Sequence, residues 1–344
     1  MTRAVIPALI VILTAGLLIG GAAAAEWTPV TVTDTDGNQI TISEQPDKII
    51  SLAPACTEII YAVGAGDRVI GDTDYCNYPE AAKHVEKIGG FSTISNERII
   101  TLCDENTVIF ANPKNNGKET IDYLKEHGCT VIAADIRSVD DIYTAIDLIG
   151  TTVGCKENAD KLNREIKASI DRISAKVADA KASGNVPTVM HIIQTNPYYV
   201  SGKNTFQDEL ITIAGGRNAF SDVDGWGTVT LERLLVTDPD IIITDAVNDS
   251  GSFNNISLAD AIKNEPRLAA LSAVKNNKVY SINQDIFNRG GPRIVEALDM
   301  LAKILHPEIF GAAPTQTPAK TPGFGAVSVL CGVLGAALLL RRKE

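Results

Sequence analysis

Six aromatic residues lie in segments that the sequence predicts to be loops, namely Tyr78, Phe91, Tyr198, Tyr199, Trp226 and Phe287. Aromatic residues make up only 5% of the chain, so their presence in predicted loops is notable. Flat rings bind a large, partly apolar ligand through dispersion and stacking. For each ring taken alone, packing against its own domain is an equal alternative. For Trp226 we expect ligand contact, because the flanking Gly225 and Gly227 bury a side chain poorly.

The segment Arg289-Gly290-Gly291-Pro292-Arg293 is a second candidate for ligand binding. Its two glycines allow backbone N–H groups to face a ligand, and Pro292 suits the first turn of a helix that follows. Arg289 offers forked donors to carboxylate, phosphate or amide oxygens. For Arg293 we expect a structural ion pair.

Familiar catalytic and metal-binding patterns are missing from the sequence. It contains no G-x-x-x-x-G-K-[ST], H-E-x-x-H or G-x-S-x-G segment, and its four histidines include no pair at metal-ligand spacing. Its six cysteines form no C-x-x-C pair, so no zinc or redox site is expected, and disulfides cannot be assigned. We therefore expect no catalytic residue, no metal site and no cofactor, which favours a binding protein over an enzyme.

Composition limits the class of protein further. The chain has 344 residues, which suggests about two domains, and its 45% hydrophobic content is ample for packed cores. Its net charge is −11. An acidic surface repels phosphate backbones, so no nucleic acid is expected as a partner.

Both ends of the chain carry features of surface proteins. Residues 1–25 combine a basic start, an uncharged run and a small-residue end, which predicts a secretory signal peptide; a retained membrane anchor is the alternative. Residues 311–322 form a Thr/Pro linker. Residues 323–344 hold an uncharged run followed by a basic cluster, and with Pro322 they resemble the PGF-CTERM sorting signal of archaeal surface proteins. The resemblance implies exchange for a lipid anchor, while a C-terminal transmembrane helix is the alternative.

Strands and helices alternate in two stretches, residues 26–155 and 187–310, which predicts two α/β lobes with mainly parallel sheets. A hairpin is predicted within residues 26–46, around Asp36-Gly37. Between the lobes, apolar residues recur at steps of three and four from Ala159 to Val177. This spacing predicts one long connecting helix over 156–181 that joins the lobes rigidly.

A short pattern occurs once in each predicted lobe. Phe91 precedes Glu97 by six residues, and Trp226 precedes Glu232 by six; each glutamate is followed by arginine and two aliphatic residues. We predict that each aromatic lies on a loop before a helix and that each acid lies in the first turn of that helix. The helix dipole alone favours an acid there. Docking of the two acids onto two basic sites of a partner is the equal alternative.

Several segments together resemble the solute-binding proteins of ABC importers for cobalamin and iron–siderophore complexes. The resemblance covers residues 29–310, and its matching segments are 48–58, 64–71, 78–81, 88–91, 200–203, 289–293 and 305–308. It implies two α/β lobes joined by one rigid helix, with limited lobe closure. It also implies that Glu97 and Glu232 engage arginine pockets on the permease.

The resemblance also bears on the ligand. Aromatic clamps of the cobalamin-binding members match Tyr78, Phe91 and Trp226, although Phe91 stands where the best-known member has a tryptophan. Stacking rings suit a corrin, while arginine and tyrosine also suit an anionic ferric chelate. The predicted ligand-binding residues are Tyr78, Phe91, Tyr198, Trp226, Phe287 and Arg289.

The sequence as a whole predicts a monomeric receptor on the outer face of the cell membrane. It is secreted through its signal peptide, tethered by its C-terminal segment, and binds a metal chelate between its lobes for delivery to an ABC permease and its ATPase. A corrinoid is slightly favoured as the ligand, and an iron–siderophore or haem is the alternative. An enzyme acting on a metal chelate in the cleft and a purely structural surface protein are the alternatives from other classes.

Overall fold

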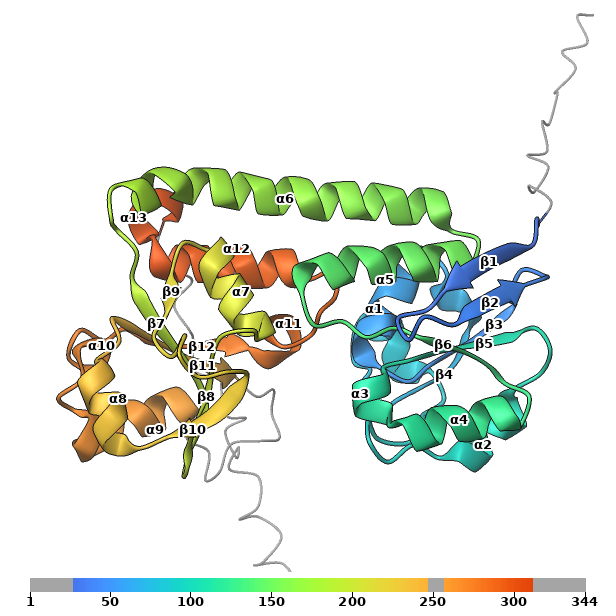
Figure 1. The fold of residues 1–344 in the computed structure, drawn as a ribbon, viewed down its shortest axis with the longest axis horizontal. Helices are drawn as coiled ribbons and strands as arrows, with labels where there is room; N and C mark the ends of the chain where they lie inside the picture. Colours follow the sequence, from blue (N-terminus) through green and yellow to red (C-terminus); the bar gives the residue numbers. More distant parts are fainter. Residues whose placement is uncertain (1–26, 247–256, 312–344) are drawn as a thin grey trace, which may run out of the picture.

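The computed structural model describes residues 27–246 and 257–311, which form two α/β lobes joined by one long helix (Figure 1). The fold class predicted from the sequence is confirmed. The predicted signal peptide, the Thr/Pro linker beyond residue 311 and the C-terminal segment lie outside the described residues. Within the described ranges, no helix combines the length and the apolar character needed to cross a lipid bilayer.

The N-terminal lobe is built on a four-stranded parallel sheet in the order β4-β3-β5-β6. The strands are β3 (Lys48–Ser51), β4 (Val69–Asp72), β5 (Thr107–Ala111) and β6 (Thr130–Ala133). Every residue of β5 is buried, as is typical of a central strand covered on both faces. The predicted hairpin is present as β1 (Val30–Thr33) and β2 (Gln39–Ile42), which pair antiparallel.

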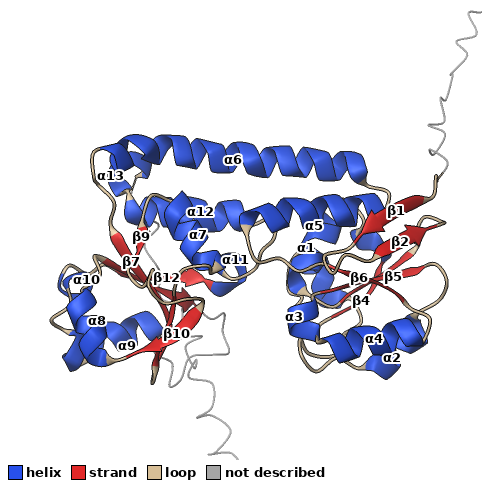
Figure 2. Cartoon of the chain, viewed as in Figure 1, coloured by secondary structure: helices blue, strands red, loops and turns tan. Residues whose placement is uncertain are grey.

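Helices cover both faces of this sheet, as Figure 2 shows. Alternate strand residues point to opposite faces, so Ile49 packs with α1 and α5 while Ile50 packs with α2 and α4. The helices of this lobe are α1 (Pro54–Ala62), α2 (Asn96–Leu102), α3 (Pro113–Asn116), α4 (Lys118–Glu126) and α5 (Val139–Thr152).

The C-terminal lobe contains a mixed sheet in the order β10-β8-β7-β11-β12, with β9 also paired to β7. Strands β7, β9, β11 and β12 run parallel, whereas β8 and β10 are antiparallel additions at one edge. The strands are β7 (Thr188–Thr195), β8 (Tyr198–Ser201), β9 (Arg217–Asn218), β10 (Trp226–Val229), β11 (Ile241–Ala246) and β12 (Val279–Asn283). The helices are α7 (Phe206–Ile213), α8 (Leu231–Thr237), α9 (Leu258–Asn264), α10 (Ser272–Lys275), α11 (Gln284–Phe287), α12 (Ile294–Leu305) and α13 (Pro307–Phe310).

The connecting helix α6 (Lys156–Ala182) is one continuous helix of 27 residues, about 40 Å long at the usual rise per residue. Its buried face includes Ala159, Ile166, Ile170 and Val177, which follow the predicted spacing. This face packs on α5 in the N-terminal lobe and on α12 in the C-terminal lobe. Because one apolar stripe is buried against both lobes, a change in their relative orientation must disturb this packing.

Candidate functional site

Trp226 and Tyr199 form a stacked aromatic pair on the sheet of the C-terminal lobe. Their ring centroids lie 5.7 Å apart and their planes differ by 18°. Trp226 begins β10 and Tyr199 lies in β8, so the prediction that both lie on loops is wrong. The antiparallel register pairs Trp226 with Ser201 and Thr228 with Tyr199, which brings the two rings together diagonally on one face of the sheet. Both side chains stay half-buried.

The positions of Tyr198 and Phe287 also differ from the predicted ones, which were on ligand-facing loops. Strand alternation directs Tyr198 to the face opposite Tyr199, where it is 7% exposed and packs in the core cluster that contains Val200. Phe287 is the last residue of α11 and is fully buried. Both rings are therefore core residues of the C-terminal lobe in this structure.

His191 connects the aromatic pair to the loop that carries Arg289. The ring of His191 is fully buried and meets the Trp226 ring edge to face, with centroids 5.6 Å apart. Its ring nitrogens lie 3.2 Å from Ser201 Oγ and 3.1 Å from Asp245 Oδ1. Asp245 in turn accepts a hydrogen bond of 2.7 Å from Asn288. Because Asn288 immediately precedes Arg289, this network holds the arginine loop beside the aromatic pair.

In the N-terminal lobe, three aromatic residues lie on the loops that follow β4. Tyr75 and Tyr78 are 58% and 44% exposed, and Phe91 is half-buried. The rings of Tyr75 and Phe91 meet edge to face, 6.3 Å apart. The carbonyl of Phe91 accepts a hydrogen bond of 3.0 Å from Asn116, which ties this loop to the end of α3. Tyr78 and Phe91 thus lie on loops, as predicted.

Five polar residues connect the two lobes, and we call them the inter-lobe ion cluster: Glu58, Asn77, Asp285, Arg289 and Arg293. Arg293 donates to both carboxylate oxygens of Glu58, at 2.9 and 2.6 Å. Arg289 donates to Glu58 at 3.2 Å and to Asn77 at 2.8 Å, and it pairs with Asp285 at 2.8 Å. Asn77 also donates to Asp285 at 2.8 Å. Glu58 of the N-terminal lobe therefore meets Arg289 and Arg293 of the C-terminal lobe, and Asp285 of that same lobe balances the second positive charge.

The charged side chains of the inter-lobe ion cluster are largely buried and pair with one another. The side chains of Glu58, Arg289 and Arg293 are only 2%, 14% and 13% exposed. Burial lowers the pKa of Arg293, but the hydrogen bond and attraction to Glu58 outweigh it, so the pKa lies above its ordinary value. The ion pair predicted for Arg293 is confirmed. The forked donors of Arg289 are occupied by protein oxygens, including the Tyr75 carbonyl at 3.1 Å.

The glycine segment before Arg293 also differs from the prediction. Gly290 is buried, and a Cβ atom there would lie 2.4 Å from the side chain of Ile136 in the N-terminal lobe. Gly290 therefore permits close approach of the lobes and does not present its backbone to a ligand. Helix α12 begins at Ile294 with Arg293 as its N-cap residue, so Pro292 lies before the helix and not in its first turn.

The contacts place the aromatic pair, the inter-lobe ion cluster and the N-terminal aromatic residues in one region. Arg289 touches the Tyr75 carbonyl, and the guanidinium of Arg293 lies 4.1 Å above the Tyr78 ring. Most of these residues follow the carboxyl ends of parallel strands, such as β4 and β12, which is where open α/β sheets bind ligands. The region offers aromatic surface from both lobes around a charge-balanced junction.

Sequence reasoning did not select Glu58, Asn77, His191, Asp245 or Asp285 for this region. Glu58 lies inside a segment that carries the family resemblance, but its type and position in α1 resemble those of any helical glutamate. Its partners lie more than 200 positions away in the sequence. Spacing along the chain carries no signal for such a contact.

Comparison with known proteins identifies the family. Residues 49–286 match the family described as periplasmic binding protein. The chain belongs to this family. Residues 321–343 match the PGF-CTERM motif, which agrees with the resemblance found in the sequence.

Three relatives illustrate the similarity of this periplasmic binding protein to known members. An uncharacterized ABC transporter substrate-binding lipoprotein of Bacillus subtilis is 31% identical, over 82% of this chain and 87% of the relative. The periplasmic vitamin B12 binding protein of Vibrio cholerae is 27% identical with a TM-score of 0.64, covering 76% of this chain and 97% of that structure. A periplasmic heme-binding protein of Roseiflexus sp. RS-1, in apo form, is 26% identical with a TM-score of 0.67, covering 78% and 99%.

Glu97 and Glu232 occupy matching places in the two lobes of the binding protein. Each is exposed and lies in the first turn of its helix, α2 or α8, as predicted. Figure 1 shows these helices in different lobes, both on the side away from α6. Hydrogen bonding to its own backbone N–H and to Thr230 lowers the pKa of Glu232, so this carboxylate is ionised at neutral pH.

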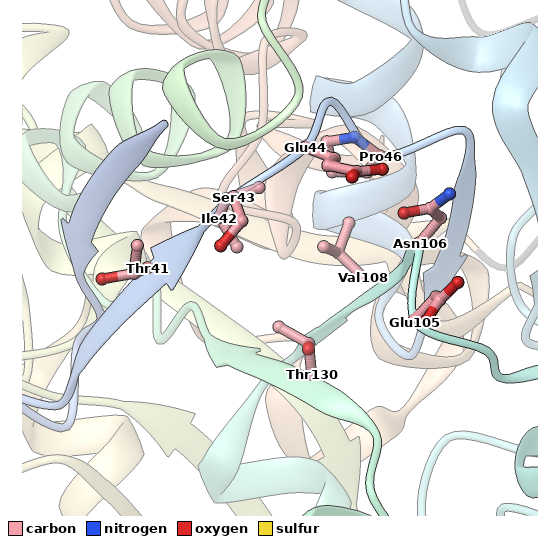
Figure 3. A pocket seen from close by; sticks show the side chains of 9 residues that line it. All are labelled: Thr41, Ile42, Ser43, Glu44, Pro46, Glu105, Asn106, Val108 and Thr130. Atoms are coloured by element: carbon pink, nitrogen blue, oxygen red, sulfur yellow. The ribbon is translucent and has the colours of Figure 1, made fainter. Parts of the chain in front are cut away.

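Two surface cavities of the binding protein lie away from this region. One, of about 300 Å³, is lined by Glu44, Glu105 and Thr130 among others and opens at the amino ends of β5 and β6 (Figure 3). The other, of about 490 Å³, contains Tyr198 and Arg267. Both are lined by residues of a single lobe. Among the described residues, no three His, Cys, Asp or Glu side chains cluster closely enough to hold a metal ion.

Proposed function

We propose that this periplasmic binding protein captures a corrinoid between its lobes and delivers it to an ABC permease driven by its ATPase. The observation that carries the proposal is the stacked Trp226–Tyr199 pair, held beside a charge-balanced junction whose arginines also contact Tyr75 and Tyr78 of the other lobe. A corrin ring is broad and flat, with amide groups on its rim, so stacking and hydrogen bonding suit it. The protein binds the ligand and passes it to the permease, and it forms or breaks no covalent bond. It acts as a monomer and needs no cofactor of its own.

The charge balance of the junction favours a corrinoid over an anionic ferric siderophore. Arg289 and Arg293 are paired with Glu58 and Asp285, so they carry no surplus positive charge toward a ligand. Binding a strongly anionic chelate there requires breaking a buried pair, which leaves a carboxylate uncompensated. The vitamin B12-binding relative supports the same ligand class.

Haem is the second candidate, because an exposed tyrosine lies in the region. Tyr75 is 58% exposed and stands beside Phe91, and a phenolate oxygen is a known axial ligand of haem iron. The heme-binding relative has the same fold.

We propose a location on the outer face of the cell membrane. The PGF-CTERM match and the basic tail support surface sorting, with the body tethered through the C-terminal segment. A lipid exchanged for the tail and a retained transmembrane helix both place the two lobes outside the cell.

Titration of the purified protein followed by visible absorption tests the ligand. We expect cobalamin to change the spectrum saturably at a ratio of one ligand per chain, and calorimetry to give the same endpoint. A ferric siderophore should leave both signals unchanged. Saturable binding of haem with no response to cobalamin selects the second candidate, and turnover of a bound chelate by the isolated protein contradicts a pure binding role.

Replacing Trp226 with alanine tests the stacking surface. We expect ligand affinity to fall by about 1–3 kcal/mol, roughly 5- to 150-fold, because the ring contributes apolar contact and stacking. Tyr123→Ala is the matched control, since Tyr123 is 39% exposed on α4 and lies outside the proposed site. Equal affinities of the two variants by calorimetry contradict a stacking role of Trp226.

A further inference from the structure

Cys103 and Cys129 lie at the ends of two neighbouring helices on one face of the N-terminal sheet. Cys103 is the C-cap residue of α2, and Cys129 lies between α4 and β6. Helices α2 and α4 contact each other. Cys129 is 5% exposed in the core cluster of this face, and the half-buried Cys103 packs against the same cluster. The five cysteines of the described residues are free thiols in this structure.

Strand register and hydrogen bonds bring the two cysteines to the same place in the fold. The parallel register pairs Val108 with Thr130, so the preceding residues, Thr107 and Cys129, lie side by side. The backbone N–H of Asp104 donates to the Thr107 hydroxyl at 3.1 Å, and that hydroxyl donates to the Asp104 carboxylate at 2.7 Å. Cys103, the neighbour of Asp104, is thereby held next to Cys129.

We propose that Cys103 and Cys129 form a disulfide once the protein is outside the cell, and that this bond fixes the end of helix α2 to the sheet. This proposal rests on the proposed location outside the cell, because disulfides persist where the surroundings are oxidising. It does not depend on the identity of the ligand. The bond closes a loop that contains all of β5 and α4.

The oxidation needs a two-electron acceptor, such as a small disulfide of the glutathione type. One thiolate attacks the S–S bond of this disulfide and releases one small thiol, which leaves a mixed disulfide. The second thiolate then attacks the protein sulfur of that mixed disulfide and releases the other small thiol. The two cysteines lose two electrons and two protons in total, and the small disulfide gains them.

At neutral pH the thiols react slowly, because few of them are ionised to the thiolate. Burial raises the pKa of Cys103, and the neighbouring Cys129 thiol raises it further. Since the thiolate is the attacking species, raising the pH from about 7 to about 9 accelerates formation of the bond.

The disulfide has a mechanical consequence for the proposed docking. Helix α2 has only seven residues and carries Glu97 in its first turn, so the helix is short enough to depend on its anchoring. The matching helix α8 is anchored by Asp238, whose carboxylate accepts from the backbone N–H and the hydroxyl of Ser272, at 2.6 and 2.7 Å. A rigid α2 loses less conformational freedom when Glu97 binds a partner.

Peptide mapping of the purified full-length protein under non-reducing conditions tests the pair. After incubation with oxidised glutathione, we expect one cross-linked product that joins the peptide of Cys103 to that of Cys129. The same product is expected with Cys155→Ser, the matched control, and it is absent with Cys103→Ser. A bond that joins Cys56 to Cys76 instead, or full alkylation of Cys103 and Cys129 after oxidation, overturns the proposal.

Thermal unfolding of the wild-type protein gives a second readout that needs no variant. We expect the midpoint of the oxidised protein to lie about 5–10 °C above that of the reduced protein, because the bond restricts the unfolded chain. An unchanged midpoint contradicts a stabilising bond. Neither measurement involves a ligand or a permease. Absence of the disulfide therefore does not contradict the proposed transport role, and absence of transport does not contradict the disulfide.

Discussion

Replacing both Glu97 and Glu232 with glutamine is expected to abolish uptake of the ligand while leaving its affinity unchanged. Both side chains are exposed on the first turns of α2 and α8, and neither belongs to the aromatic pair or to the inter-lobe ion cluster. A charge-assisted hydrogen bond contributes about 1.5–3 kcal/mol, so loss of two weakens docking to a permease by roughly 10²- to 10⁴-fold. Uptake of labelled ligand by cells or by vesicles that contain the permease measures this effect.

The matched control removes two other exposed first-turn acids, Glu119 of α4 and Glu157 of α6. The Glu119→Gln/Glu157→Gln variant changes the net charge equally, so a general electrostatic effect lowers uptake in both variants. We expect normal uptake with the control. Normal uptake with the Glu97/Glu232 variant shows that these acids serve only the helix dipole.

Replacing Glu58 with alanine is expected to destabilise the protein by about 3–5 kcal/mol. The change leaves the guanidinium groups of Arg289 and Arg293, which are 14% and 13% exposed, without their shared carboxylate. Removing one partner of a buried ion pair is far more costly than losing a surface pair, because the remaining charge stays desolvated. Denaturant unfolding, with its midpoint and slope compared with those of the wild type, measures the loss.

Glu80→Ala provides the comparison for a surface pair. Glu80 bonds to Lys83 at 2.7 Å, but its side chain is 75% exposed, so we expect a change in the free energy of unfolding far smaller than that of Glu58→Ala. A double-mutant cycle between Glu58→Ala and Arg293→Ala should also reveal strong coupling. If Glu58→Ala is as mild as Glu80→Ala, the inter-lobe ion cluster does not hold the lobes together.

Local patterns predicted the elements of this protein because their causes are local. The hairpin follows from alternating residues around Asp36-Gly37, and α6 follows from its apolar spacing. The cap of α7 is equally local, since the Thr205 hydroxyl accepts from the backbone N–H of Asp208 at 3.2 Å. Each of these signals involves residues within one or two turns of one another.

The candidate site was predicted less completely, because its residues are selected by strand register. Tyr198 and Tyr199 are adjacent and chemically identical, yet only Tyr199 stacks on Trp226. The choice depends on how β8 pairs with β10, since a shift of one residue reverses the face of every side chain. No property of the Tyr198-Tyr199 segment reveals that register.

The sequence by itself determined the two α/β lobes, the connecting helix and the matching positions of Glu97 and Glu232, because periodicity and helix-end chemistry act over short distances. Only the tertiary structure decided that Arg289 pairs with Glu58, a residue 231 positions away, and that Phe287 is buried. Burial and ion pairing arise when the lobes meet. Their energies depend on water excluded from that contact, which neighbouring residues in the chain do not encode.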